Sequence, residues 1–138
     1  MTHTKTNGRK REAVLPPIKV TEDDRRRLNV LANSSIELFP RVSHFLAREL
    51  ERATVLADVA DLDGVVRMGS QVSYRVDETN ETREVVLVYP HEADINLNRI
   101  SVLTPVGAAL VGLSTGQSIE FQTPGRQTRS LTVLGVSQ

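Results

Sequence analysis

The stretch "HEAD" places three residues that could bind a metal close together in the sequence: His91, Glu92 and Asp94. Imidazole and carboxylate groups bind transition metals, but two adjacent ligands followed by a third match no recognised metal-ligand spacing. The other histidines, His3 and His44, are far from this group in sequence, and the chain has no cysteine. A solvated loop is the simpler interpretation of "HEAD", and we expect no metal and no cofactor.

Two further segments contain acids that could bind magnesium, which requires hard oxygen ligands close together. Glu22, Asp23 and Asp24 begin an expected helix, where carboxylates interact favourably with the helix dipole. Glu37 is the only acid in the stretch "NSSIELFP". The sequence has neither a Gly-rich phosphate loop nor a nucleophile elbow. We therefore expect no catalytic residue, no small-molecule substrate and no enzyme activity.

Two helices in the first half of the chain are expected to position these acids. Thr21 can cap a helix near residues 22–32, which has acids in its first turn and arginines in its second. The stretch "SSIELF" interrupts this helix, and Pro40 suits the first position of another. The second helix carries apolar residues at helical spacing, with Glu49 as the polar exception. We predict a short antiparallel helical hairpin with Glu37 at its tip.

After Asp61 the sequence becomes rich in strand patterns. "VVRMGSQVSYRV" and "REVVLVYP" flank the polar turn "DETNET". Val72, Tyr74 and Val76 alternate with polar residues, which is typical of a half-buried strand. "NRISVL", "SIEFQ" and "RSLTVLGV" predict further short strands, with "TPGRQT" as the turn between the last two. We predict an α+β fold in which the helical hairpin precedes an antiparallel β-sheet wrapped around one short helix.

That short helix begins at Thr104 and Pro105, in the stretch "HEADINLNRISVLTPVGAALVG". Thr104 can cap the helix, Pro105 suits its first position, and Gly112 can end it. Gly107 costs helix stability, which indicates a packing reason for a residue without a side chain. Nothing in this arrangement requires Asp94 in the loop before the preceding strand. Two interpretations stay open: a solvated turn acid, or an exposed, rigid docking point formed together with the helix start.

Charge is spread unevenly along the 138 residues, although the formal net charge is zero. Within residues 1–19 a single acid, Glu12, accompanies five basic residues: Lys5, Arg9, Lys10, Arg11 and Lys19. We expect residues 1–19 to be a flexible basic arm, which either aids solubility or makes weak contacts to nucleic-acid phosphates. Residues 61–138 have nine acids and six arginines, which argues against a dedicated nucleic-acid-binding domain. No apolar run approaches the ~20 residues that span a bilayer, so we expect a cytoplasmic protein without membrane contact.

Five short motifs in the second half of the chain occur in a specific order. They are "MGS" at residues 68–70, "EAD" at 92–94, "ISV" at 100–102, Thr104-Pro105 and "ALVG" at 109–112. In this combination the chain resembles the C-terminal domain of the Gre-type transcript cleavage factors, which have Ser-Pro in place of Thr104-Pro105. "LVYP" at residues 87–90 and Ala108 are more similar to the Rnk branch of that family, the regulators of nucleoside diphosphate kinase.

The resemblance implies an FKBP-like C-terminal domain that docks on RNA polymerase at the rim of its secondary channel. In Gre-type factors the loop acid and the Ser-Pro turn belong to the docking surface. The matching positions in this sequence are Asp94, Ser101, Thr104, Pro105 and Val106. The residue patterns divide the chain into three parts, the arm 1–19, the helical hairpin 20–60 and the sheet domain 61–138, and the resemblance implies that the third is FKBP-like.

Gre-type factors hold a catalytic magnesium ion with paired carboxylates at the tip of a long coiled coil. The helices expected here, of about 11 and 16 residues, would rise only roughly 16 and 24 Å, and Glu37 is the one acid near their junction. We therefore predict a non-catalytic, polymerase-binding transcription regulator that could compete with Gre-type factors. Two alternatives remain: a transcript-cleavage factor with a degenerate tip, and a nucleic-acid-binding protein that acts through residues 5–19.

Overall fold

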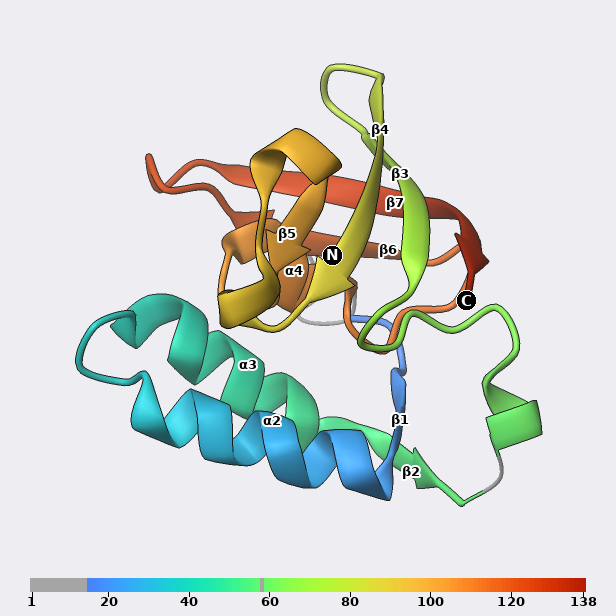
Figure 1. Ribbon diagram of the computed structural model, residues 1–138. Coiled ribbons are helices and arrows are strands. Elements are labelled where there is room, and N and C mark those ends of the chain that lie inside the picture. The colour runs from blue at the N-terminus through green and yellow to red at the C-terminus, as the bar shows by residue number, and fades with distance from the viewer. Residues whose placement is uncertain (1–14, 58) are drawn as a thin grey trace, which may run out of the picture.

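The computed structural model describes residues 15–57 and 59–138, which form an α+β fold (Figure 1). Helices α2 (Glu22–Ser34) and α3 (Pro40–Arg52) lie side by side on one side of a curled five-stranded sheet. The short helix α4 (Pro105–Leu110) contacts both α3 and the sheet strand β6 (Ser118–Gln122). The helices and the sheet therefore enclose one core, with α4 between them.

The beginnings of both long helices follow from local sequence. The Thr21 side chain accepts a hydrogen bond from the Asp24 amide at 3.1 Å and caps α2, as predicted. Pro40 is the first residue of α3, which is also as predicted. We expected α3 to continue past Arg52, but the helix ends there, and the β-branched residues that follow form β2 (Thr54–Leu56). Strand β2 pairs in parallel with β1 (Lys19–Thr21), a two-stranded sheet that the sequence analysis missed.

The larger sheet has the strand order β5-β4-β3-β7-β6. Strands β3 (Gln71–Val76), β4 (Glu81–Val88), β6 and β7 (Thr128–Ser137) pair in antiparallel fashion. The prediction of a purely antiparallel sheet is wrong at β5 (Arg99–Ser101), which runs parallel to β4. Between β4 and β5 lie two short 3₁₀ helices, Pro90–Glu92 and Ile95–Leu97. They return the chain towards the start of β4, so that β5 runs in the same direction as β4.

Small and aliphatic side chains fill the core. Ala108, Ala109 and Leu110 of α4 are buried among leucines and valines of the sheet and of the long helices. Gly107 has the packing reason that its sequence position suggested, because a Cβ atom there would lie 2.1 Å from the Ser101 carbonyl oxygen. Helix α4 ends at Leu110, short of the predicted stop at Gly112, because Val111 already adopts an extended conformation; Gly112 then follows with a φ of +85°.

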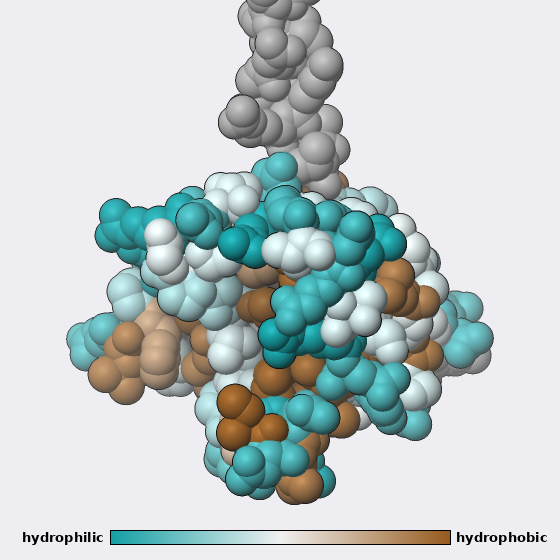
Figure 2. All heavy atoms as spheres, turned by 90° about the horizontal axis from the view of Figure 1, so that it is seen from above, coloured by the Kyte–Doolittle hydropathy of each residue, from teal (hydrophilic) through white to brown (hydrophobic). Residues whose placement is uncertain are grey.

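The end of the segment that we expected to be an arm is part of this core. Ile18 is buried, and the Lys19 amide donates a hydrogen bond to the Gly112 carbonyl at 3.1 Å. The expectations for residues 1–14 lie outside the described residues. None of the helices in the described part of the chain is long and apolar enough to cross a membrane. On the face shown in Figure 2, hydrophobic residues lie at both sides, at the lower end and also near the middle, between hydrophilic ones.

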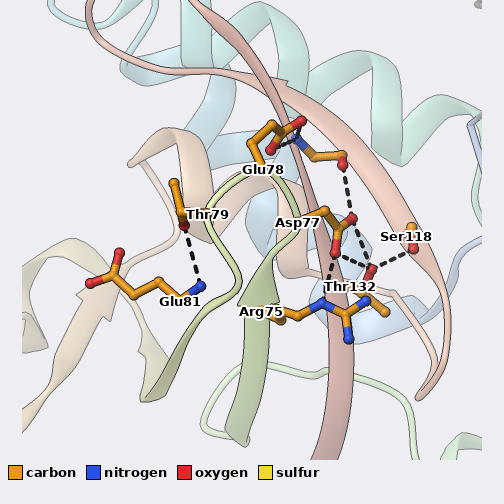
Figure 3. Close-up of polar contacts among 8 residues, drawn as sticks. Arg75, Asp77, Glu78, Thr79, Glu81, Ser118 and Thr132 are labelled. Carbon is orange, nitrogen blue, oxygen red and sulfur yellow. Dashed lines mark hydrogen bonds and ion pairs between the residues drawn. The ribbon is translucent and has the colours of Figure 1, made fainter.

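A polar cluster fixes the turn between β3 and β4 to β7, the strand that pairs with β3 (Figure 3). The Asp77 carboxylate accepts hydrogen bonds from the Ser130 and Thr132 hydroxyls at 2.8 and 2.9 Å, and from the Arg75 guanidinium at 3.0 Å. The Ser118 hydroxyl of β6 lies 2.7 Å from that of Thr132. Burial alone would raise the pKa of Asp77, but these hydrogen bonds and the Arg75 charge outweigh it and lower the pKa.

Candidate functional site

The loop that carries Asp94 is closed by its own backbone. Asp94 and Arg99 exchange two backbone hydrogen bonds, each of 3.0 Å, and form an isolated antiparallel bridge. One carboxylate oxygen of Asp94 accepts a hydrogen bond from the Asn96 amide at 3.0 Å. Asn98, with a φ of 56°, adopts the left-handed conformation that the tight return requires. The loop is therefore short and internally bonded, and it holds the Asp94 carboxylate at the surface.

Two aliphatic side chains beside Asp94 are exposed, and the sequence analysis did not identify them. Ile95 is 86% exposed and Leu97 is 55% exposed. Ile95 is the most exposed of the large hydrophobic residues in the part of the chain that the structure describes. Two large aliphatic residues in the polar stretch "DINLNR" were the signal for them, because a solvated loop does not need such side chains.

The turn formed by residues 101–106, which follows this loop, is held by hydrogen bonds between side-chain hydroxyls and the backbone. The Ser101 Oγ accepts a hydrogen bond from the Leu103 amide at 2.9 Å. The Thr104 hydroxyl donates to the Ser101 carbonyl at 2.7 Å and accepts from the Gly107 amide at 3.0 Å. Thr104 is thus the N-cap of α4, as predicted, and both hydroxyls are engaged within the chain.

The five residues predicted from the resemblance differ in exposure. Asp94 is exposed, whereas the other four are half-buried: Ser101, Thr104, Pro105 and Val106. Ser101 follows Arg99 by two positions in β5, a separation of roughly 7 Å along a strand, and Arg99 pairs directly with Asp94. The structure therefore places the loop 94–99 and the turn 101–106 next to each other. We call these two segments together the corner.

The connection between α2 and α3 is apolar at its surface. Glu37 is exposed, and it is followed by Leu38 and Phe39, which are 80% and 49% exposed. The Phe39 amide donates a hydrogen bond to the Ser35 carbonyl at 2.8 Å, which closes the connection tightly. A single carboxylate beside two large apolar side chains differs from the paired acids that bind Mg²⁺.

The acids at the start of α2 belong to the fold. Asp23 pairs with Arg26 and Arg27 on its own helix, and Asp24 is half-buried. Burial raises the pKa of Asp24, an effect that the Met68 backbone amide partly offsets. Because α2 has 13 residues, these acids lie roughly 20 Å from the connection at its other end.

Tyr89, just before the "HEAD" stretch, contacts both α2 and His91. The Arg27 guanidinium lies over the Tyr89 ring at 4.8 Å from its centroid, and the His91 ring stacks on Tyr89 at 6.5 Å. The Glu92 carboxylate accepts a hydrogen bond from the Tyr89 amide at 3.4 Å. Within residues 15–57 and 59–138 no three His, Cys, Asp or Glu side chains gather where they could hold a metal ion.

Comparison with known proteins assigns both halves of this structure. Residues 61–138 match the family described as the C-terminal part of transcription elongation factor GreA/GreB. The chain belongs to the Gre family. Residues 16–56 match a second family, described as the Rnk N-terminus. The resemblance to Gre-type factors and to their Rnk branch is therefore confirmed.

Individual relatives agree with this Gre-family assignment. Over 119 residues the chain is 34% identical to the regulator of nucleoside diphosphate kinase of Escherichia coli strain K12, an alignment that covers 86% of this chain and 88% of that protein. Over 82 residues it is 40% identical to the transcription elongation factor GreA of Rhodospirillum rubrum, covering 56% of this chain and 52% of GreA.

One solved structure has a similar fold along nearly its whole length. The prokaryotic transcription elongation factor GreA/GreB from Nitrosomonas europaea is 35% identical and superimposes with a TM-score of 0.70. The match covers 90% of this chain and all of the other. The mixed α+β arrangement of helices and curled sheet is thus one that this Gre-family protein shares with a solved relative.

Proposed function

We propose that this Gre-family protein is a non-catalytic transcription regulator that binds RNA polymerase at the rim of its secondary channel through the corner. The observation that carries the proposal is the closed loop 94–99, which presents the Asp94 carboxylate with exposed Ile95 and Leu97 beside it. The names of the relatives, transcription elongation factors among them, support RNA polymerase as the partner.

The rigidity of the corner supports this role. A segment whose backbone is already ordered loses little conformational entropy on binding, which favours affinity. Exposed aliphatic side chains around one charge provide an apolar contact area and one directional contact. In this proposal the Thr104 and Ser101 hydroxyls act indirectly, because they hold the turn in shape. Pro105 and Val106 contribute the part of their surface that is exposed.

The same proposal divides the chain into three parts. The segment 1–19, of which Ile18 and Lys19 pack against the fold, precedes a short helical hairpin, 20–60, which points towards the channel. An FKBP-like domain, 61–138, carries the corner. The matches to the Rnk N-terminus at residues 16–56 and to the GreA/GreB C-terminal family at 61–138 support this division. Weak contact of the arm with nucleic acid remains part of the proposal.

The dimensions of the helices support a role without transcript cleavage. Helices α2 and α3 each have 13 residues and rise roughly 20 Å. The connection between them offers Glu37 as its one carboxylate, beside Leu38 and Phe39. A second metal-binding carboxylate is missing from residues 35–39, so the tip lacks the pair that magnesium recruitment requires.

Binding to purified core RNA polymerase tests the docking. Asp94→Arg is expected to weaken binding tenfold or more, because it places a like-sized charge of opposite sign at the centre of the contact. Asp63→Arg is the matched control, since Asp63 is also an exposed acid but lies outside the corner. Equal affinity of wild type and Asp94→Arg would refute the docking surface.

Backtracked elongation complexes test the absence of cleavage activity. We expect no release of RNA 3′ fragments above the rate of polymerase alone. Release that Glu37→Gln abolishes would show instead that the protein is a cleavage factor with a degenerate tip.

A further inference from the structure

A hollow of about 990 Å³ opens between α3, the edge of β6 and the turn that joins β6 to β7. In Figure 1 this turn extends at the left, above the connection between α2 and α3. Pro105 of the corner lies at its edge, and Leu103 lines it from the same segment. We call this hollow the α3 groove.

Aromatic side chains gather in the α3 groove. All three phenylalanines of the chain line it: Phe39, Phe45 and Phe121. Phe121 is buried, Phe45 is half-buried, and Phe39 is 49% exposed. Phenylalanine contributes a large apolar area in interfaces, and a fold that needed these rings only for its core would cover Phe39 as well.

One wall of the groove is positively charged. Arg41, His44 and Arg48 recur at helical spacing, so they project from one side of α3, and all three are exposed. Neither arginine forms an ion pair with an acid among residues 15–57 and 59–138. Glu120 is the acid that lines the groove, and it is half-buried in β6 on the opposite wall.

We propose that the α3 groove binds a segment of RNA polymerase that carries apolar side chains flanked by aspartate and glutamate. Apolar side chains of such a segment would cover the phenylalanines, and its carboxylates would meet Arg41 and Arg48. Pro105 belongs to both the corner and the groove edge, so the two surfaces are continuous. The inference rests on the proposed function and adds to the corner a second contact with the same partner.

Charge reversal on α3 tests this contact in the full-length protein with core RNA polymerase. Arg41→Glu and Arg48→Glu are each expected to lower the association rate constant about fivefold, and the double variant more, with a weaker dependence on salt. Arg83→Glu is the matched control, because Arg83 is an exposed arginine on β4 outside the groove. Phe39→Ser is expected to raise the dissociation rate about tenfold, and circular dichroism confirms that each variant is folded.

Photo-crosslinking identifies the occupant. In one variant of this chain the photoreactive residue benzoylphenylalanine replaces His44. In a second, control variant it replaces Arg83. We expect His44 to crosslink to a polymerase peptide rich in aspartate and glutamate, and Arg83 not to do so. Crosslinks from His44 only to RNA or DNA, only to a second copy of this chain, or to nothing while the protein is bound would each overturn the inference.

The two proposals fail in different ways. If the wild-type protein does not bind core polymerase, the proposed function is wrong, and the groove contact with it. If the wild type binds and Asp94→Arg does not, while the Arg41 and Arg48 variants bind normally, the function stands and the groove inference is wrong.

Discussion

Replacement of Thr104 by alanine tests whether its hydroxyl supports the corner from within. The hydroxyl makes two hydrogen bonds, donating to the Ser101 carbonyl at 2.7 Å and accepting from the Gly107 amide at 3.0 Å. The Ser101 carbonyl keeps a second donor, the Thr104 amide at 3.1 Å. The Gly107 amide belongs to a buried residue at the first turn of α4, so it loses its cap and receives no water.

These losses set the expected magnitude. Loss of an N-cap costs about 1 kcal/mol, and an unsatisfied buried amide brings the total to about 1–2 kcal/mol. For a chain of 138 residues this corresponds to a fall in Tm of roughly 4–8 °C. Thr104→Ser keeps the hydroxyl and is expected to stay close to wild type, whereas Thr104→Val keeps the shape without the hydroxyl and is expected to behave like alanine.

Thermal and urea unfolding of the four proteins, followed by circular dichroism, provide the measurement. The reasoning is refuted if the valine variant is as stable as wild type, or if the serine variant is as unstable as alanine. Polymerase binding measured well below the Tm adds a second readout. Thr104→Ser is expected to bind as wild type does, because it preserves both the cap and the position of the neighbouring loop.

Three further predictions concern other parts of the same structure. Gly107→Ala is expected to destabilise the fold by about 2 kcal/mol in urea unfolding, because its Cβ would lie 2.1 Å from a carbonyl oxygen, and a wild-type stability would contradict the close packing. Asp77→Asn is expected to cost about 1 kcal/mol at pH 7. Since the pKa of Asp77 is lowered in the folded state, this difference is present above the ordinary value of 3.8 and disappears as the pH falls through the lower folded value; a difference that grows in acid would be the wrong sign. The pair Ile95→Ser and Leu97→Ser is expected to leave stability within about 0.5 kcal/mol, because both side chains are exposed, while it weakens polymerase binding; a large loss of Tm would show that the loop needs them for folding.

Features set by neighbouring residues could be predicted from the sequence. Thr21 and Thr104 precede their helices and cap them through the amide three positions on, and Pro40 and Pro105 occupy the first helical positions. Each feature depends on interactions within one turn of helix, where side-chain chemistry acts locally. The polar turns between β3 and β4 and between β6 and β7 were predictable for the same reason.

Features set by distant pairing were missed. The direction of β5 depends on where two 3₁₀ turns bring the chain, and no residue within β5 determines it. The pairing of β1 with β2 joins residues 19–21 to residues 54–56, and it ends α3 earlier than the apolar periodicity indicates. The exposure of individual side chains could not be predicted either, because hydropathy alone does not distinguish Ile95, at the surface, from Ile119, in the core.

The substitution of threonine for the family's serine before proline has a physical explanation in the hydrogen bonds of Thr104. If the hydroxyl of residue 104 contacted the partner directly, the methyl group that threonine has and serine lacks would also lie in the interface. Here the hydroxyl faces inward, to Ser101 and Gly107, so either serine or threonine can supply the cap. In the proposed docking, recognition depends on the surface that this cap supports, namely the Asp94 carboxylate and the exposed aliphatic side chains beside it. Under this proposal, cap-preserving changes at residue 104 should alter affinity much less than Asp94→Arg does, although residue 104 belongs to the group of motifs that carries the Gre-type resemblance.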